Sequence, residues 1–233
     1  MLNFLGIGAQ KCGTTWLHDA LAREPGIVFP AGKEIHYWNL PQGRSIEWYS
    51  TLFNDDTKIN GDITPAYSFL PKTTIQKIHA GFPNLRLIYL IRNPMERAWS
   101  AARMALGRAE MLHDEASDQW FMDHFLSRGS LARGDYETCI RQWRSVYDPN
   151  QLLIIRYETI SRDPASIVNT CLQHILSKPF VSIQDNAQLS KKVFEGDGVP
   201  LPPRLHVALK RIYFSRIESL SEFLQQDFSN WTN

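Results

Sequence analysis

Two short motifs of the chain carry side chains suited to binding anions. The first, GAQKCGTTW at residues 8–16, nearly fits the phosphate-loop pattern G-x-x-x-x-G-K-[ST]. Thr14 stands where that pattern has its lysine, and Lys11 lies inside the loop instead. Where such a loop enters a helix, free N–H groups and the positive end of the helix dipole favour an anion. An ordinary strand–helix turn capped by Thr14 or Thr15 is the alternative, because glycine loops alone are weak evidence.

The altered lysine position argues against a nucleoside triphosphatase. In phosphate-loop enzymes the lysine reaches the β- and γ-phosphates, and the next hydroxyl holds Mg²⁺. The two strongest predicted strands, 85–91 and 151–157, also lack a terminal aspartate that could hold a metal. They are followed by Arg92-Asn93 and by Glu158-Thr159. The sequence therefore predicts an anion site that requires no metal.

The second motif, LIRNPMERAWS, places Arg92 at the end of an apolar strand and Ser100 on the helix that follows. In parallel sheets, ligands bind outside the carboxyl ends of the strands. We therefore expect Arg92 to point into the same crevice as the loop around Lys11. A guanidinium fork with a hydroxyl suits a second, separate phosphate. The alternative is a surface arginine and a serine that merely fills a helix position.

The elements expected to position these motifs alternate along the chain. Apolar runs predict strands at residues 3–8, 27–29, 85–91 and 151–157. Helical spacing predicts helices after residue 14, at 71–80, from residue 94, and at 117–127, 136–147, 164–175 and 205–224, with a long loop at 178–203. This order favours a single α/β domain over residues 1–233, a three-layer sandwich with a central parallel sheet and a phosphate-loop-like strand–loop–helix.

The composition excludes several classes of partner. The chain has 25 basic and 24 acidic residues, so its net charge is close to zero. No overall positive field would therefore attract nucleic acid or an anionic membrane. Cys12, Cys139 and Cys171 are scattered, which suits a reducing compartment. No signal-peptide pattern and no transmembrane segment are predicted. We expect a cytoplasmic enzyme or binding protein without a nucleic-acid partner, and the sequence leaves a homodimer open.

Together the two motifs resemble those of the sulfotransferases that use 3′-phosphoadenosine 5′-phosphosulfate (PAPS). The resemblance extends to KEIHYW, GDITPAY, QLLIIRYETISRDP and FLQQDFSNW, so it covers nearly the whole chain. It implies that Arg92 and Ser100 bind the 3′-phosphate of PAPS and of its product PAP, and that Trp16 stacks on the adenine or else packs in the core. The 5′-phosphosulfate would be bound by the first loop, through Lys11, Cys12, Gly13, Thr14 and Thr15.

The segment GKEIHYW supplies two candidate bases, Glu34 and His36. In an extended segment, residues two apart project from the same side. The resemblance to heparan-type sulfotransferases favours Glu34, whereas the cytosolic small-molecule type uses a histidine. Partial burial that raises the pKa of Glu34 would suit a general base, and Lys11 would neutralise charge on the leaving phosphate. The expected reaction is in-line transfer of a sulfuryl group to a hydroxyl or amine of a sugar, lipid or small molecule.

Two other functions stay open on the sequence alone. A phosphate-loop kinase would bind Mg·ATP, and a non-catalytic nucleotide-binding protein could retain the same fold. Asp62 and Thr64-Pro65 in GDITPAY could line the acceptor side or form a turn. Arg97 is expected to pair on its own helix rather than to bind a ligand. Many relatives close a glycine- and lysine-rich loop over the nucleotide. Residues 178–203 do not spell that motif, although they contain Lys191 and Lys192.

Overall fold

The computed structural model describes residues 1–179, 181, 182, 184, 186–190 and 199–232, in two compact units. The first unit consists of residues 1–91 and the described residues of 141–194. The second consists of residues 92–140 and the described residues from 199 onward. The expectation of one sulfotransferase domain over residues 1–233 stays a prediction.

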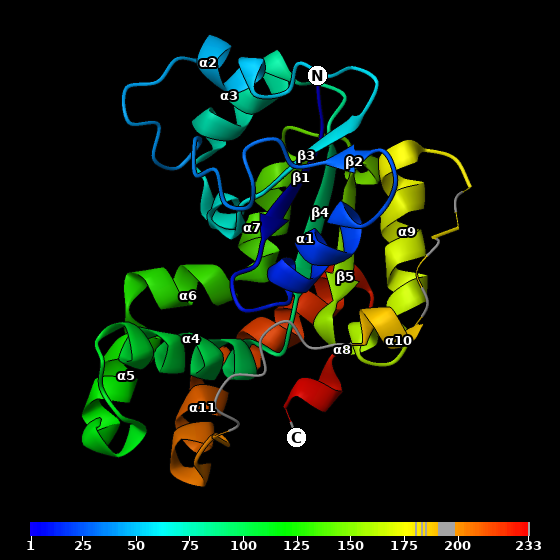
Figure 1. Cartoon of the computed structure of the whole chain (residues 1–233). Coiled ribbons are helices and arrows are strands. Elements are labelled where there is room, and N and C mark those ends of the chain that lie inside the picture. Colours follow the sequence, from blue (N-terminus) through cyan, green and yellow to red (C-terminus); the bar gives the residue numbers. More distant parts are fainter. Residues whose placement is uncertain (180, 183, 185, 191–198, 233) are drawn as a thin grey trace. The chain divides into compact units, whose positions relative to one another are not determined.

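A parallel sheet of five strands forms the centre of the first unit, and helices flank it (Figure 1). Its strand order is β2-β3-β1-β4-β5. The strands are β1 (Leu2–Gly8), β2 (Ile27–Val28), β3 (Ile59–Ile63), β4 (Arg86–Ile91) and β5 (Leu152–Arg156). β4 lies between β1 and β5 and is buried at every position but its first, as expected of a parallel strand covered on both faces. The predicted α/β fold with a central parallel sheet is confirmed.

β3 is a strand that the sequence analysis did not predict. Its sequence, INGDI, places Asn60 and Asp62 in the sheet, and both side chains are fully buried. β3 pairs with β1 in parallel, with Leu5 beside Asp62 and Gly6 beside Ile63. The GDITPAY segment therefore contains the end of a buried strand and the short 3-10 helix η1 (Pro65–Phe69), not a simple surface turn.

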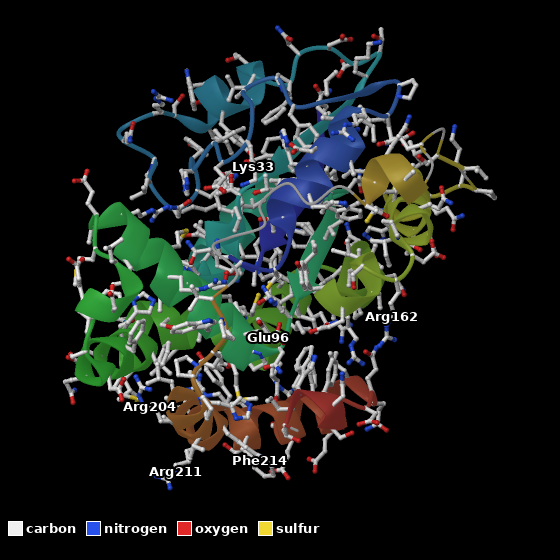
Figure 2. All side chains as sticks on the ribbon, turned by 60° about the horizontal axis from the view of Figure 1, so that its bottom comes forward. Lys33, Glu96, Arg162, Arg204, Arg211 and Phe214 are labelled. Carbon is white, nitrogen blue, oxygen red and sulfur yellow. The ribbon has the colours of Figure 1, made fainter. Side chains whose placement is uncertain are left out.

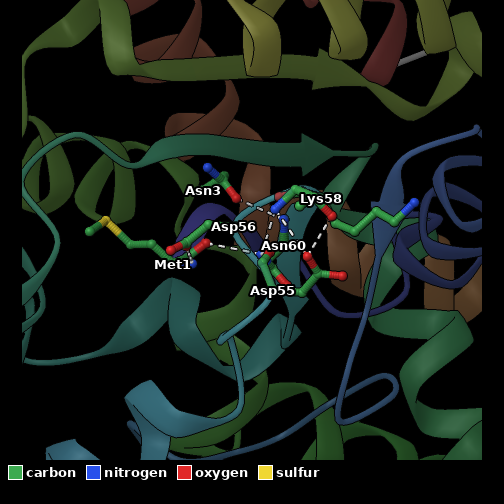
Figure 3. A network of polar contacts seen from close by, with 7 residues as sticks. Met1, Asn3, Asp55, Asp56, Lys58 and Asn60 are labelled. Carbon is green, nitrogen blue, oxygen red and sulfur yellow. Dashed lines mark hydrogen bonds and ion pairs between the residues drawn. The ribbon is translucent and has the colours of Figure 1, made fainter.

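The side chain of Asn60 holds the start of β3 in place (Figure 3). Its amide nitrogen donates hydrogen bonds to the carbonyl oxygens of Asp55, Met1 and Lys58, at 2.8, 3.2 and 3.3 Å. Its backbone N–H donates to the side-chain oxygen of Asn3 at 2.7 Å. These bonds link the beginnings of β1 and β3, so they stabilise the register that brings both strands to the same edge of the sheet.

Helices of the first unit mostly follow the predicted pattern. They are α1 (Thr14–Ala22), α2 (Ile46–Thr51), α3 (Lys72–Gly81), α8 (Tyr157–Ile160), α9 (Pro164–Leu176) and α10 (Asn186–Leu189), with the 3-10 helix η3 (Pro149–Gln151). α9 packs on β4, β5 and α1. α2 was not predicted; the Ser45 side chain caps it by accepting from the N–H of Trp48 at 3.3 Å. α10 lies in the stretch expected to be a long loop.

The second unit is helical. Its helices are α4 (Pro94–Arg108), α5 (Asp118–Leu126), α6 (Arg128–Gly134), the first part of α7 (Tyr136–Arg144), α11 (Pro203–Leu224) and the 3-10 helices η2 (His113–Glu115) and η4 (Ser229–Trp231). α4, α5 and α6 contact one another, and α11 packs on α4 and α5. The exposed side chains of Arg204, Arg211 and Phe214 extend from α11 (Figure 2). Among the described residues, no helix combines the length and apolar character needed to cross a membrane.

Candidate active site

The glycine loop, residues 8–13, leads from β1 into α1 as predicted. Gly13 is the N-cap of α1 and has a φ of 91°, which favours glycine. A Cβ at this position would also come within 3.0 Å of the Tyr157 ring. The residue at the N-cap is Gly13 and no side chain caps α1, so the cap at Thr14 or Thr15 named in the alternative is not formed. The N–H groups of the first helical turn point toward the loop, at the positive end of the helix dipole.

Side chains of the glycine loop differ in their access to a ligand. Lys11 is partly exposed and has a left-handed backbone with a φ of 69°. Cys12 is fully buried, and its N–H donates to the carbonyl oxygen of Ala9 at 3.2 Å. Thr14 is buried, whereas Thr15 is partly exposed. The structure thus brings these predicted residues into one turn, in which the Cys12 side chain packs into the core.

Trp16 links the glycine loop to a distant part of the chain. Its side chain is partly exposed on α1, and its indole N–H donates to the carbonyl oxygen of Leu189 in α10 at 2.8 Å. The predicted contact of Trp16 with adenine stays a prediction. Lys191 and Lys192, in the stretch compared above with a nucleotide-covering loop, lie outside the described residues.

The two candidate bases lie together, but not in the way that the sequence suggested. Glu34 and His36 have φ values of 63° and 59°, so the expected extended backbone is wrong. His36 Nε2 nevertheless lies 3.3 Å from Glu34 Oε2, because the two left-handed residues curl the segment. Lys33, labelled in Figure 2, contacts the other carboxylate oxygen of Glu34. His36 Nδ1 lies 3.2 Å from the side-chain oxygen of Asn39.

The charge around Glu34 decides its protonation. Burial alone would raise the pKa of the Glu34 carboxyl, but the ammonium of Lys33 and the imidazole of His36 outweigh this effect and hold the pKa below its usual value. Glu34 therefore lacks the raised pKa that would suit a general base. The Glu34 carboxylate is ionised at neutral pH and can accept a proton. The Lys33 side chain is its nearest counter-ion.

Backbone hydrogen bonds place Glu34 beside the strand that neighbours the glycine loop. The N–H of Glu34 donates to the carbonyl oxygen of Ile63 at 3.1 Å, and the N–H of Thr64 donates to the carbonyl oxygen of Gly6 at 3.0 Å. Ile63 is the register partner of Gly6 on β1, which ends at Gly8. The candidate base and the loop are therefore positioned by the carboxyl ends of adjacent parallel strands, the usual place of ligands in such sheets.

Asp62 organises the interior beneath this edge. Its carboxylate accepts hydrogen bonds from the hydroxyls of Tyr49, Tyr67 and Thr64, at 2.8, 2.9 and 2.7 Å. Complete burial raises the pKa of Asp62 even though these three donors and the nearby His36 favour its ionised form. Asp62 and Thr64 are both fully buried. Their role is to support the end of β3, and neither side chain presents itself to a ligand.

Arg92 and Ser100 belong to the second unit, so their predicted crevice with Lys11 stays a prediction. Nε and Nη2 of Arg92 lie 3.0 and 2.7 Å from one carboxylate oxygen of Glu96, which Figure 2 labels. The hydroxyl of Tyr136 donates to the carbonyl oxygen of Arg92 at 2.8 Å. Ser100 is partly exposed on α4. A phosphate bound by Arg92 would compete with the carboxylate of Glu96.

Solved structures share this fold. The sulfotransferase from Alicyclobacillus acidocaldarius superposes with a TM-score of 0.78 at 24% identity, covering 100% of this chain and 99% of its own. Mouse sulfotransferase SULT7A1, complexed with PAP, gives a TM-score of 0.60 at 17% identity, covering 96% of this chain and 88% of its own.

Within the described residues, no group of three or more histidine, cysteine, aspartate or glutamate side chains could hold a metal ion.

Sequence comparison identifies the family. Human heparan sulfate glucosamine 3-O-sulfotransferase 6 is 33% identical over 70% of this chain and 48% of its own length. Human bifunctional heparan sulfate N-deacetylase/N-sulfotransferase 2 is 26% identical over 77% of this chain and 22% of its own. The membrane-associated sulfotransferase kil1 of Dictyostelium discoideum is 38% identical over 42% of this chain and 22% of its own. This chain thus spans between about a fifth and a half of these relatives. Since the sulfotransferase domain profile matches residues 3–192, the chain belongs to the sulfotransferase family.

Proposed function

We propose that this chain transfers a sulfuryl group from PAPS to a hydroxyl or amine of an acceptor. The observation that carries the proposal is the joint position of the glycine loop and the Glu34–His36 pair, at the carboxyl ends of adjacent strands. An anion-binding turn and a proton acceptor are the two parts that such a transfer needs. Membership of the sulfotransferase family supports the reaction class, and the PAP complex of the mouse neighbour supports the choice of donor.

The residues of the loop fit the phosphosulfate end of PAPS. The first-turn N–H groups of α1 and the ammonium of Lys11 would bind its negative charge. PAPS itself supplies the sulfuryl group and the leaving phosphate. As the bond to the leaving phosphate breaks, Lys11 would stabilise the charge that grows on the bridging oxygen. Arg92 and Ser100 would bind the 3′-phosphate, with Arg92 exchanging the Glu96 carboxylate for the phosphate.

Glu34 is the proposed general base. Its carboxylate is ionised and partly exposed, so it can take the proton from an acceptor hydroxyl or amine during the attack on sulfur. Lys33 and His36 keep the carboxylate charged until the acceptor arrives. His36 is the alternative base; in that arrangement Glu34 would orient the imidazole through the contact at 3.3 Å. The proposal assigns no step to a metal.

Nucleotide binding separates this function from that of a kinase. We expect isothermal titration calorimetry to detect tight binding of PAP, and much weaker binding of Mg·ATP. The physical reason is that the chain has a separate candidate site for a 3′-phosphate but lacks the phosphate-loop lysine that follows the second glycine. Tight binding of Mg·ATP with no heat from PAP would favour the kinase and overturn the proposal.

Variants of the two candidate bases separate an enzyme from a non-catalytic nucleotide-binding protein. Glu34→Gln should lower turnover by about 10²- to 10⁴-fold while PAP affinity is kept, since general bases contribute on that order. His36→Ala should lower turnover less if Glu34 is the base. Glu47→Gln, which changes an exposed glutamate of α2 in the same unit, is the matched control. Equal turnover in Glu34→Gln, His36→Ala and wild type would reject both candidate bases.

The acceptor, the cellular location and the assembly state are proposals as well. We propose a sugar, lipid or small-molecule acceptor, which a sulfate-transfer screen across these classes would identify. A cytoplasmic location is proposed because Cys12, Cys139 and Cys171 are all unbridged and buried, which suits a reducing compartment. Cell fractionation tests the location, and light scattering tests whether the chain forms a homodimer.

A further inference from the structure

A buried arginine without a counter-ion lies among the helices of the second unit. Arg97, on α4, is 0% exposed. Its Nη2 donates hydrogen bonds to the carbonyl oxygen and the hydroxyl of Ser130 on α6, at 3.1 and 3.0 Å. Its Nε and Nη1 are shielded from solvent and have no hydrogen-bond partner. The expectation that Arg97 pairs on its own helix is therefore wrong, because its bonds go to α6 and two of its nitrogens stay unused.

The groups around Arg97 are also cationic or can become so. His124, on α5, is partly buried, and its Nε2 is shielded from solvent without a hydrogen-bond partner. Burial lowers the pKa of His124, and the positive charges of Arg97 and Arg133 lower it further. Arg133, on α6, donates to the carbonyl oxygen of Gly129 at 2.8 Å. Burial, Arg97 and the exposed Arg108 lower the pKa of its guanidinium. In the described part of the chain, no carboxylate forms an ion pair with Arg97 or His124.

Such a cluster is costly unless a negative charge joins it. Buried arginines are almost always paired, and a buried donor without a partner costs about 1–3 kcal/mol, more when it is charged. A water molecule would satisfy the N–H groups of Arg97 but would not offset the positive charge of its buried guanidinium. A small anion would do both. Guanidinium and imidazolium N–H groups match the oxygens of an oxyanion in geometry and charge.

We propose that α4, α5 and α6 form a binding site for a small oxyanion of the sulfate or phosphate class, held by Arg97, His124 and Arg133. The three helices contact one another, so one ion could reach a side chain from each. His124 and Arg133 are partly exposed, which makes their side of the cluster the path of entry. Its three residues belong to the second unit, whereas the glycine loop belongs to the first.

Binding of sulfate to variants tests this site. Equilibrium dialysis with labelled sulfate should give one more bound ion per chain in the wild type than in Arg97→Met. Any sulfate held by the glycine loop would be the same in both proteins. His124→Gln and Arg133→Gln should each lower the affinity of this site for sulfate by on the order of tenfold or more. The reason is that a charge-assisted hydrogen bond contributes about 1.5–3 kcal/mol. Arg128→Gln, which changes an exposed arginine of α6, is the matched control and should leave sulfate binding unchanged. Equal stoichiometry in Arg97→Met and wild type would overturn the proposal.

A measurement on the wild type tests the oxyanion site even if Arg97→Met fails to fold. NMR titration of the His124 imidazole, assigned with His124→Gln, should show that sulfate raises the pKa of His124 at constant ionic strength. An anion bound beside the ring favours its charged form, so the site should bind sulfate more tightly as the pH falls. The absence of any sulfate-dependent shift would refute the site. A shift equally large with chloride would refute its preference for oxyanions.

Discussion

Removal of the Tyr49 hydroxyl tests the buried network beneath the candidate base. Tyr49→Phe deletes one of the three donors to Asp62, at 2.8 Å, and leaves the ring stacked on Tyr37 with centroids 4.6 Å apart. A hydrogen bond to a charged group contributes about 1.5–3 kcal/mol, so the free energy of unfolding should fall by that amount. For a chain of this length each kcal/mol changes Tm by about 2–4 °C, which gives a decrease of roughly 3–12 °C.

The matched control is Tyr147→Phe. The Tyr147 hydroxyl is also buried and donates to the carbonyl oxygen of Phe82 at 3.0 Å, but that acceptor is neutral. A bond between neutral groups contributes about 0.5–1.5 kcal/mol, so this variant should lose less stability. Urea unfolding of wild type, Tyr49→Phe and Tyr147→Phe near pH 7 measures the difference. An equal loss in the two variants would mean that Asp62 is not a charged acceptor.

The pH dependence gives a second, independent result. Burial raises the pKa of Asp62 in the folded state above its value in the unfolded chain. Protonation of Asp62 therefore favours the folded state, and this contribution to the free energy of unfolding is fully present below the ordinary pKa. It is lost as the pH rises through the folded-state pKa. Tyr49→Phe removes a donor that favours the ionised form and should raise the pKa of Asp62 further. The difference between variant and wild type should therefore shrink as the pH is lowered. A pH-independent difference would refute this reasoning.

Four further variants probe the proposed nucleotide site. Gly13→Ala should lower stability by about 1–3 kcal/mol, because alanine would be strained at this positive φ and would meet the Tyr157 ring; unchanged urea unfolding would contradict this. Arg92→Ala should weaken binding of PAP more than that of adenosine 5′-phosphate, and Glu96→Gln, which removes the negative charge that Arg92 contacts, should tighten PAP binding; equal effects on both nucleotides in calorimetry would argue against a 3′-phosphate contact. Lys11→Ala should reduce turnover more than PAP affinity, and an unchanged rate in a sulfate-transfer assay would remove Lys11 from the mechanism.

Strands that consist of a continuous apolar run could be predicted from the sequence, and a strand with polar residues could not. β4 and β5 consist largely of apolar residues, and the continuous apolar run predicted both. β3 contains Asn60 and Asp62, whose hydrogen-bond partners include Asn3 and Tyr49. Those partners are distant in sequence, so no local period reveals that the Asp62 carboxylate and the Asn60 backbone N–H are hydrogen-bonded inside the sheet.

In the candidate site, too, the sequence predicted which residues take part but not their backbone conformation or charge. The spacing of the glycines predicted the turn into α1, and the sequence predicted that Glu34 and His36 lie together. It did not predict the left-handed backbone at both residues, nor the direction of the Glu34 pKa. That direction depends on where the flexible Lys33 side chain ends, which residue type and spacing leave undetermined.

The bond between the Trp16 indole and Leu189 has a consequence for ligand recognition. It engages the N–H at the edge of the ring, so the proposed stacking of an adenine on the ring face would not require this bond to break. If binding of the adenine instead required the indole ring to rotate, the hydrogen bond to Leu189 would first have to break. The carbonyl group of Leu189 would then lose this contact.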